Sequence, residues 1–366
     1  MRELLDTVRA WQAEGVSLGR AVVVRTFGSA PRPEGAVLVV TADGRLAGSV
    51  SGGCVEGAAS EEIQAARRDG LCRVIRYGIS DEQAWDVGLA CGGTIDVLVE
   101  PSLRPEVVDA AGRTSGSVVV IPLPADAPDA APGPRRPGSG ETPAPAFGVA
   151  EDGTLRGSTG LPDADAAIVA AAGKVLAEGG SVTVAAAGRQ FFLEGYPAPP
   201  RLVVVGGVQV AIPLVRLARE LGYLTVVVDA RAAFATRERF PEVDRLVVGW
   251  PDEVADEIGL GPGDAIAVLT HDVKFDEPAI ITGLRRGCRY VGAVGSRRTQ
   301  ADRRARLRAA GVTDAELARL HGPIGLDLGG RAPAETALAI MAEVVAERHG
   351  GSGAPLRVLA ETKATA

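Results

Sequence analysis

Aromatic residues are scarce in this 366-residue chain, at 4% Phe, Trp and Tyr, and there are four cysteines. Four widely spaced cysteines without a C-x-x-C pair form neither a disulfide framework nor a zinc knuckle. No apolar run approaches the ~20 residues of a membrane-spanning helix, and the N-terminus lacks the apolar core of a signal peptide. We therefore expect reduced thiols and a cytoplasmic protein without a membrane span.

An excess of basic charge is also missing. Lys and Arg number 39 against 46 Asp and Glu, which gives a net charge of −7. A general nucleic-acid binder needs a basic face, and the only concentrated Lys/Arg block lies within residues 297–308. We expect no nucleic-acid partner.

Glycine, alanine and valine dominate instead, with 47 glycines in the chain. Buried parallel strands are typically near-continuous apolar runs of this kind. A chain of this length is too long for one typical domain. The composition therefore predicts a multidomain α/β protein.

The first part of the chain predicts an α+β domain over residues 1–121. An amphipathic helix opens it, and strand-like runs at 21–27, 36–41, 72–77 and 94–100 alternate with turns and a helix near 56–68. Asp43-Gly44 between apolar runs is a hairpin signal, because a type I′ turn needs positive φ at both central residues. The pattern D-G-x-L-x-G-S at 43–49 recurs at 152–158. The recurrence indicates a repeated hairpin, with chance similarity as the alternative.

Residues 122–160 are interpreted as a linker or insertion with a hairpin. Eight of the 24 prolines lie between residues 122 and 145, and proline removes backbone donors and favours extended chain. A helix at 164–178 and a hairpin at 181–194 follow, as an extension over 161–200 of the N-terminal domain. Residues 201–349 then form the last domain, and 350–366 a flexible tail.

From residue 201 strands alternate with helices, which predicts a Rossmann-like, doubly wound parallel sheet. Ligands of such sheets bind outside the carboxyl ends of the strands. The candidate residues that follow a strand are Gly206, Gly207, Asp229, Thr270, His271, Asp272, Gly295, Ser296, Arg297 and Arg298. The sequence therefore predicts a binding edge in this domain.

The dinucleotide fingerprint G-x-G-x-x-G/A is incomplete here, because Val208 replaces its second glycine. Asp229 stands where a ribose-binding acid belongs, although an acid at a strand end also serves turns and caps. NAD(P) binding thus stays open, and with His271 as a proton donor it would make the chain an oxidoreductase. His271 is otherwise a structural hydrogen-bond partner. Residues 295–298 are typical of an oxyanion site or of a solvated helix N-terminus.

Two cysteines adjoin glycine pairs, as Gly52-Gly53-Cys54 and Cys91-Gly92-Gly93. Glycine lets a ligand approach the backbone. A helix start beside Cys54 would favour the thiolate, a soft ligand for molybdenum or sulfur. Small core residues and a persulfide-carrying sulfur transferase are the alternatives for these two cysteines. Cys72 and Cys288 are predicted to be packing residues.

Together with Thr270-His271-Asp272, residues 295–298 and the Pro-Ile-Gly-Leu-Asp run at 323–327, the two cysteine segments resemble the xanthine dehydrogenase accessory protein family of XdhC/CoxI type. The resemblance covers most of the chain in the same order and fails around 115–160. It implies a maturation factor rather than a turnover enzyme: a homodimeric chaperone that binds molybdenum cofactor (molybdopterin). Such a chaperone assists sulfuration by a cysteine desulfurase and delivers the cofactor to a molybdenum hydroxylase apoenzyme of xanthine or carbon monoxide dehydrogenase type.

The resemblance also implies a set of binding residues. Cys54 and Cys91 would contact molybdenum or its sulfur, while glycine-rich turns and arginines would hold the terminal phosphate. The full set is Arg32, Ser51, Gly52, Gly53, Cys54, Cys91, Gly92, Gly93, Gly206, Gly207, Asp229, Thr270, His271, Asp272, Gly295, Ser296, Arg297, Arg298, Gly325 and Asp327.

Overall fold

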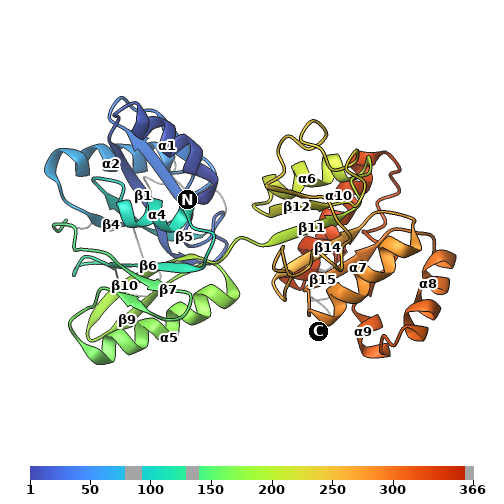
Figure 1. The fold of residues 1–366 in the computed structure, drawn as a ribbon. Coiled ribbons are helices and arrows are strands. Elements are labelled where there is room, and N and C mark those ends of the chain that lie inside the picture. The colour runs from blue at the N-terminus through green and yellow to red at the C-terminus, as the bar shows by residue number, and fades with distance from the viewer. Residues whose placement is uncertain (79–92, 129–139, 359–366) are drawn as a thin grey trace. The chain divides into compact units, whose positions relative to one another are not determined.

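The computed structural model describes residues 1–78, 93–128 and 140–358. The chain divides into two compact units, Met1–Ala198 and Pro199–Ala366 (Figure 1). The segments 1–121, 122–160 and 161–200 that the sequence analysis separates lie almost entirely in the first unit. Each unit is described by itself below.

The first unit contains two successive repeats of one arrangement. The first repeat comprises η1 (Arg2–Leu4), α1 (Leu5–Ala13), β1 (Leu18–Phe27), β2 (Val37–Thr41), β3 (Leu46–Gly48), α2 (Glu56–Asp69), β4 (Arg73–Tyr77) and β5 (Thr94–Glu100). The second repeat comprises α4 (Pro105–Gly112), β6 (Ser117–Pro122), β7 (Phe147–Ala150), β8 (Leu155–Arg156), α5 (Pro162–Glu178), β9 (Ser181–Ala186) and β10 (Arg189–Tyr196).

Each repeat forms its own five-stranded antiparallel sheet, and the two sheets share one topology. The strand orders are β3-β2-β1-β5-β4 and β8-β7-β6-β10-β9. The hairpins β2–β3 and β7–β8 carry the two D-G-x-L-x-G-S segments, with Gly44 at φ +87° and Gly153 at φ +82°. The predicted repeated hairpin is therefore confirmed, and it belongs to a repeat of the whole arrangement. The predicted type I′ turn is wrong, because Asp43 and Asp152 do not have positive φ.

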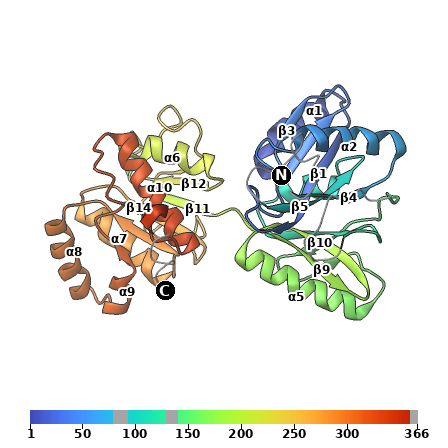
Figure 2. The ribbon, with the colours of Figure 1, turned by 180° about the vertical axis from the view of Figure 1, so that it is seen from behind.

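The first unit is a four-layer sandwich (Figures 1 and 2). Helix α2 packs on the outer face of the first sheet, through an apolar core that includes Ile63 and Ile75. Helix α5 covers the second sheet in the same way, through Ile168 and Leu193. Between the sheets lies a third core, to which α1 and α4 contribute. Alternating side chains let each strand serve both faces.

A buried guanidinium joins the two sheets of this sandwich. Arg20 on β1 is fully buried and pairs with Glu100 of its own sheet at 2.6 Å and with Glu194 of the other sheet at 3.0 Å. Tyr196 donates a hydrogen bond to Glu194 at 2.5 Å. A buried charge is tolerated only when it is paired in this way, so this cluster fixes how the sheets face each other.

The second unit is a Rossmann-like domain, as the sequence predicts. It contains β11 (Arg201–Val205), α6 (Ala211–Glu220), β12 (Leu224–Val228), β13 (Arg245–Val247), β14 (Asp264–Val268), α7 (Val273–Arg285), β15 (Tyr290–Ala293), α8 (Arg297–Ala309), α9 (Asp314–Ala318), β16 (Leu320–His321) and α10 (Pro333–His349). All six strands are parallel, in the order β13-β12-β11-β14-β15-β16. The order reverses between β11 and β14, where such sheets bind ligands.

Helices cover both faces of this sheet. Residues of α6 and α10 share one apolar core with the strands, and α7, α8 and α9 contribute to the core of the opposite face. The longest helices of the part of the chain that the structure describes, α5 and α10, have 17 residues each. None of the described helices is long and apolar enough to cross a membrane.

Candidate functional site

Glu56 organises the loop that carries Cys54. This first residue of α2 folds back over loop 49–56, where its carboxylate accepts hydrogen bonds from the hydroxyls of Ser49 (2.6 Å) and Ser51 (2.7 Å). It also accepts the backbone N–H groups of Val50, Ser51 and Gly53. Burial acts to raise the pKa of Glu56, but these hydrogen bonds outweigh it and lower the pKa to about 2. The loop is therefore built around a permanently charged carboxylate.

The two serines take up the remaining amides of loop 49–56. The Ser51 hydroxyl accepts from the N–H groups of Cys54 and Val55, both at 2.9 Å. The Ser49 hydroxyl accepts from Gly52 at 2.7 Å. Every N–H from residue 50 to 55 is thus bonded inside the loop, so these amides are not free to cradle a phosphate. Gly52 and Gly53 are exposed, and Cys54 is half-buried and packs partly against the core beneath α2.

Gly52 and Gly53 are explained by backbone conformation. Their φ angles are +79° and +117°, and a Cβ added at either would meet no atom of the described residues within 4 Å. Positive φ costs other residues about 1–2 kcal/mol. The two glycines therefore shape the turn that precedes Cys54.

Cys54 differs from the other cysteines in the described part of the chain. All three are free thiols, but Cys54 is half-buried while Cys72 and Cys288 are buried. Burial raises the pKa of the Cys72 thiol to about 11 and that of Cys288 to about 12. The predicted packing roles of Cys72 and Cys288 are confirmed. Cys54 is the accessible thiol of the three.

The second repeat contains a similar serine–acid contact at the start of α5, without the cysteine. In loop 158–165 Ser158 donates to Asp165 at 2.6 Å, and the two are seven residues apart, as are Ser49 and Glu56. The N–H of Thr159 donates to the same carboxylate, and the N–H of Gly160 to the Ser158 hydroxyl. Where the first loop has Gly52-Gly53-Cys54, the second has Leu161-Pro162-Asp163. The second repeat makes its serine–acid contact with one glycine, Gly160 at φ +80°, and without a thiol, so the contact itself does not require Cys54.

The other predicted residues of the first unit are only partly placed near this loop. Gly93 allows close approach of the segment after β1, since a Cβ there would lie 2.8 Å from the Ala30 nitrogen. Ala30 and Cys54 pack against the same apolar core. Arg32 pairs with Glu3 at 3.1 Å, and no described contact joins it to loop 49–56. Cys91 and Gly92 lie outside the described residues.

In the second unit the structure brings the predicted segments to one edge of the sheet. Residues 206–207 follow β11, Asp229 follows β12, 270–272 follow β14 and 295–298 follow β15. Residues 323–327 follow β16. Carboxyl ends of parallel strands share one edge, so these segments are neighbours there.

Close packing explains the glycine pair at 206–207. A Cβ on Gly206 would collide with the Thr270 side chain, and one on Gly207 with the carbonyl of Phe234, whose carbon is also only 2.9 Å away. The segment after β12 therefore lies directly against Gly207, beside Val208, which replaces the second fingerprint glycine. This arrangement leaves little room for a pyrophosphate at the usual place.

Asp229 is occupied within the protein. Its buried carboxylate accepts from the Gly207 N–H at 2.8 Å and pairs with Arg231 at 2.8 Å. Burial acts to raise the pKa of Asp229, but these partners outweigh it and lower the pKa. The carboxylate thus holds the glycine turn in place, rather than standing free as a ribose acceptor.

A buried polar chain that sequence reasoning missed fixes the ends of β14 and β15. Thr270 donates to Asp276, which pairs with Arg303 at 2.7 Å. Arg303 donates to Gln300, and Gln300 donates to the carbonyl of Ala293 at 2.9 Å. All four side chains are buried. The signal in the sequence that could have revealed this chain is the set of polar residues on the buried faces of α7 and α8.

Two arginines at the start of α8 are free. Ser296 caps the helix by accepting from the Thr299 N–H at 3.1 Å. Arg297 and Arg298 follow in the first turn, exposed, and neither has a hydrogen-bond or ion-pair partner among the residues that the structure places. Unpaired guanidinium groups at a helix N-terminus suit an oxyanion.

The remaining predicted residues of this edge have mixed roles. His271 is exposed, and Asp272 caps α7 by accepting from the Lys274 N–H. Gly325 has φ +95° and donates its N–H to Glu343 at 2.8 Å. Asp327 is exposed. Loop 323–327 is therefore anchored by Glu343, a residue that the sequence analysis did not single out.

Within the described ranges, no group of three or more His, Cys, Asp or Glu side chains is placed to hold a metal ion. Cys54 would offer a metal one soft ligand. Such a donor set suits a metal that already carries most of its own ligands.

Comparisons with known proteins identify the family. The profile of the XdhC and CoxI family matches residues 11–78, and that of the XdhC Rossmann domain matches residues 202–344. The chain is 27% identical to a Bacillus subtilis protein named as a probable subunit of xanthine dehydrogenase, over 94% of this chain and 96% of that protein. It is 25% identical to the molybdenum cofactor insertion chaperone PaoD of Escherichia coli, over 93% of this chain and 88% of PaoD.

A solved structure shares the fold. The crystal structure titled a xanthine dehydrogenase from Bacillus halodurans superposes with a TM-score of 0.72, at 24% identity, over 94% of this chain and 95% of that one. Both units are therefore included in the similarity. The two profiles cover the Cys54 loop and the carboxyl edge of the parallel sheet, in the order that the sequence predicts. The chain belongs to the XdhC and CoxI family.

Proposed function

We propose that this protein is an accessory chaperone that binds molybdenum cofactor, assists its sulfuration and inserts it into a molybdenum hydroxylase of xanthine or carbon monoxide dehydrogenase type. The observation that carries the proposal is the similarity to PaoD, named a molybdenum cofactor insertion chaperone, along nearly the whole of both chains. The similarity to a protein named as a probable xanthine dehydrogenase component points to the same class of client.

Cys54 supplies the chemistry that such a cargo needs. The metal of the cofactor arrives held by its pterin, so one soft protein ligand is sufficient. Cys54 is half-buried on a loop that Glu56 and two serines hold rigid without any ligand. A preorganised thiol binds without paying the entropy of ordering the loop. Cys54 therefore contacts molybdenum or its sulfido group, and Cys91 is its proposed partner.

The donors that would hold the terminal phosphate of the cofactor are not those of loop 49–56. The amides of loop 49–56 are bonded internally, so they are not the donors that the glycine pattern led us to expect. Arg297 and Arg298 at the start of α8 are free and carry the charge that a phosphate needs. We infer that this pair, with Ser296 beside it, binds an oxyanion within the second unit.

Three partners belong to the proposal: the hydroxylase apoenzyme, a cysteine desulfurase that provides sulfur, and a second copy of the chain in a homodimer. A carrier of this kind releases what it binds, so it is a maturation factor and needs no turnover chemistry of its own.

The test is anaerobic expression in a host that makes molybdenum cofactor, followed by molybdenum analysis and pterin fluorescence of the purified protein. Wild type is expected to retain pterin and molybdenum near one per chain, and Cys54→Ser and Cys91→Ser to lose them while staying folded. Cys288→Ala is the matched control, because that buried thiol should be irrelevant to loading. Absence of pterin from wild type would contradict the proposal.

A persulfide-carrying sulfur transferase is the second candidate, favoured by the same accessible thiol. It predicts that Cys54 accepts sulfur from a desulfurase in protein without cofactor, which mass spectrometry would show as a gain of about 32 Da. The NAD(P)-dependent alternative has no such support. Phe234 packs on Gly207 and Asp229 is already paired, and a thermal shift by NAD(P) would be needed to restore it.

A further inference from the structure

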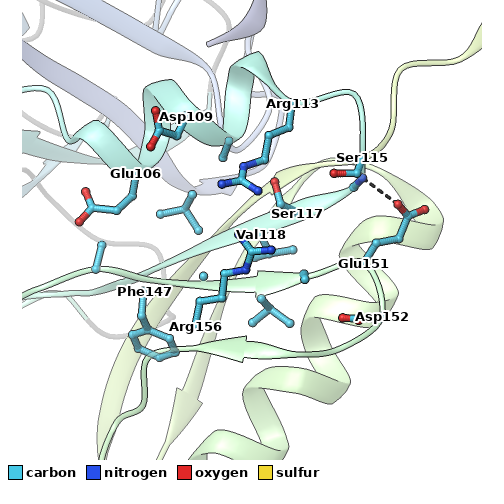
Figure 3. A pocket seen from close by; sticks show the side chains of 17 residues that line it. Glu106, Asp109, Arg113, Ser115, Ser117, Val118, Phe147, Glu151, Asp152 and Arg156 are labelled. Carbon is cyan, nitrogen blue, oxygen red and sulfur yellow. Dashed lines mark hydrogen bonds between the residues drawn. The ribbon is translucent and has the colours of Figure 1, made fainter.

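The second repeat of the first unit contains a cavity that the proposed function does not use. It has a volume of about 470 Å³ and lies between α4 and the strands β6, β7 and β8, on the side of the sheet away from α5 (Figure 3). This volume is in the range of small-molecule sites.

In the first repeat, side chains fill the position that corresponds to this cavity. There Val39 on β2 pairs with Ala47 on β3, and Val39 is fully buried. Leu4 and Trp11 of the N-terminal helical segment pack in the same apolar core. That side of the first sheet is thus closed by side chains.

In the second repeat the corresponding pair is Gly148 and Arg156. They pair across β7 and β8 as Val39 and Ala47 do across β2 and β3. Ala47 and Arg156 also occupy the same position of the D-G-x-L-x-G-S segment. The second repeat thus has Gly148 in place of the buried Val39 and Arg156 in place of Ala47. Gly148 and Arg156 both line the cavity.

Folding does not explain the glycine at position 148. It has no positive φ, and a Cβ there would meet nothing closer than 3.7 Å. Glycine inside a strand weakens the strand and often marks a place where a ligand comes close. Gly148 therefore keeps the floor of the cavity free.

Three donors from separate elements line one side of the cavity. Arg113 follows α4 and Arg156 ends β8, and Figure 3 shows the two side chains directed toward one another. Among the described residues neither guanidinium has an ion-pair partner. The Ser117 hydroxyl on β6 is buried and lacks a hydrogen-bond partner in the described structure. Both arginines are exposed, so water solvates them in the free protein, whereas the buried hydroxyl without a partner carries a desolvation cost.

Carboxylates line the remainder of the rim. Glu151 accepts from the Gly116 N–H at 2.9 Å, and Asp152 from the Thr154 N–H at 2.9 Å, so both serve the chain. Glu106 and Asp109 lie one turn apart on α4. Figure 3 shows Glu106 and Asp109 on one side of the two arginines and Glu151 and Asp152 on the other.

We propose that this cavity binds a small organic phosphate whose body carries N–H or amino donors, of the size of a purine nucleoside monophosphate. The tetrahedral group sits between Arg113, Arg156 and the Ser117 hydroxyl, since two guanidinium groups and a hydroxyl match three phosphate oxygens. The body lies over Gly148 and Val119, and its donors face Glu106 and Asp109. The inference stands apart from the cofactor-carrying function.

Isothermal titration with GMP tests the proposal, because guanine presents two adjacent donors. GMP is expected to bind wild type, and Arg113→Gln and Arg156→Gln each to weaken binding by about tenfold or more. Gly148→Val restores the residue of the first repeat. It is expected to abolish binding while leaving the chain at least as stable, which separates a filled cavity from misfolding.

Arg216→Gln, at an exposed pair with Glu242 in the other unit, is the matched control and should bind GMP as wild type does. The proposal falls if GMP does not bind wild type, if both cavity arginine variants bind unchanged, or if inorganic phosphate binds as tightly as GMP. Pterin and molybdenum retention should be unchanged in Arg156→Gln, so this test and the loading test can fail separately.

Discussion

Loops 49–56 and 158–165 are two versions of one structure within a single unit. Both are held by a serine and an acid seven residues apart, Ser49 with Glu56 and Ser158 with Asp165. One carries Gly-Gly-Cys in its centre and the other Leu-Pro-Asp. A serine–acid contact is thus common to both repeats, whereas the Gly-Gly-Cys segment stands in the first repeat alone. The difference separates structure from function without reference to any other protein.

Gly207→Ala is expected to have the largest effect on stability. It separates a glycine required by close packing from the glycines of loop 49–56, which are required by positive φ. A Cβ there would collide with the backbone of Phe234, so we expect a loss of about 3 kcal/mol in unfolding free energy. Urea denaturation measures it. Gly173→Ala in α5, where a Cβ meets nothing within 4 Å, is the control and should gain up to about 1 kcal/mol. Equal effects would show that packing is not the reason for Gly207.

Glu56→Gln tests the contacts between Glu56 and the two serines of loop 49–56. The variant loses charge-assisted hydrogen bonds in loop 49–56, at a cost of about 2 kcal/mol. Because the folded-state pKa of Glu56 is lowered to about 2 from its ordinary value of 4.5, its contribution is complete above pH 4.5 and is lost as the pH falls toward 2. Denaturation at about pH 7 and about pH 3 should therefore differ more for wild type than for the variant. Glu61→Gln, exposed on the same helix, should behave as wild type.

Gly52→Ala tests the conformational reading of the glycines. The residue has φ +79° and open space around it, so we expect a cost of about 1 kcal/mol from the backbone alone. A much larger loss in denaturation would mean that a hidden contact, rather than the turn, requires the glycine.

Cys54→Ser is expected to change stability least, by under about 0.5 kcal/mol, because the second repeat folds without this thiol. Its effect is on reactivity. In a Cys91→Ser background at about pH 8, a thiol reagent should label Cys54 long before Cys72 and Cys288, whose pKa values burial raises to about 11 and 12. Fast labelling that survives in the Cys54→Ser variant would contradict the assignment.

Much of this architecture could be predicted from the sequence. Alternation of apolar strands and helices after residue 201 is a strong local signal, and the parallel sheet follows it. The Asp-Gly turns predicted both hairpins. The full repeat was hidden, because apolar sheet faces accept many substitutions of similar size and only one short motif remained recognisable.

The reasons for the glycines could not be predicted. Gly53 and Gly207 look alike in sequence, yet one serves a positive φ and the other a close packing contact. The roles of Glu56 and of the Asp276–Arg303 pair depend on which distant groups the fold brings to them. Such long-range polar contacts leave no periodic signal, so they emerge only with the structure.

The most direct test of the central claim is transfer. Protein loaded anaerobically with molybdenum cofactor is mixed with a cofactor-free molybdenum hydroxylase, and hydroxylase turnover is followed. The account predicts that wild type and Cys288→Ala restore turnover and that folded Cys54→Ser does not. Restoration by Cys54→Ser equal to wild type, or none by wild type, would contradict a carrier that holds its cargo through Cys54.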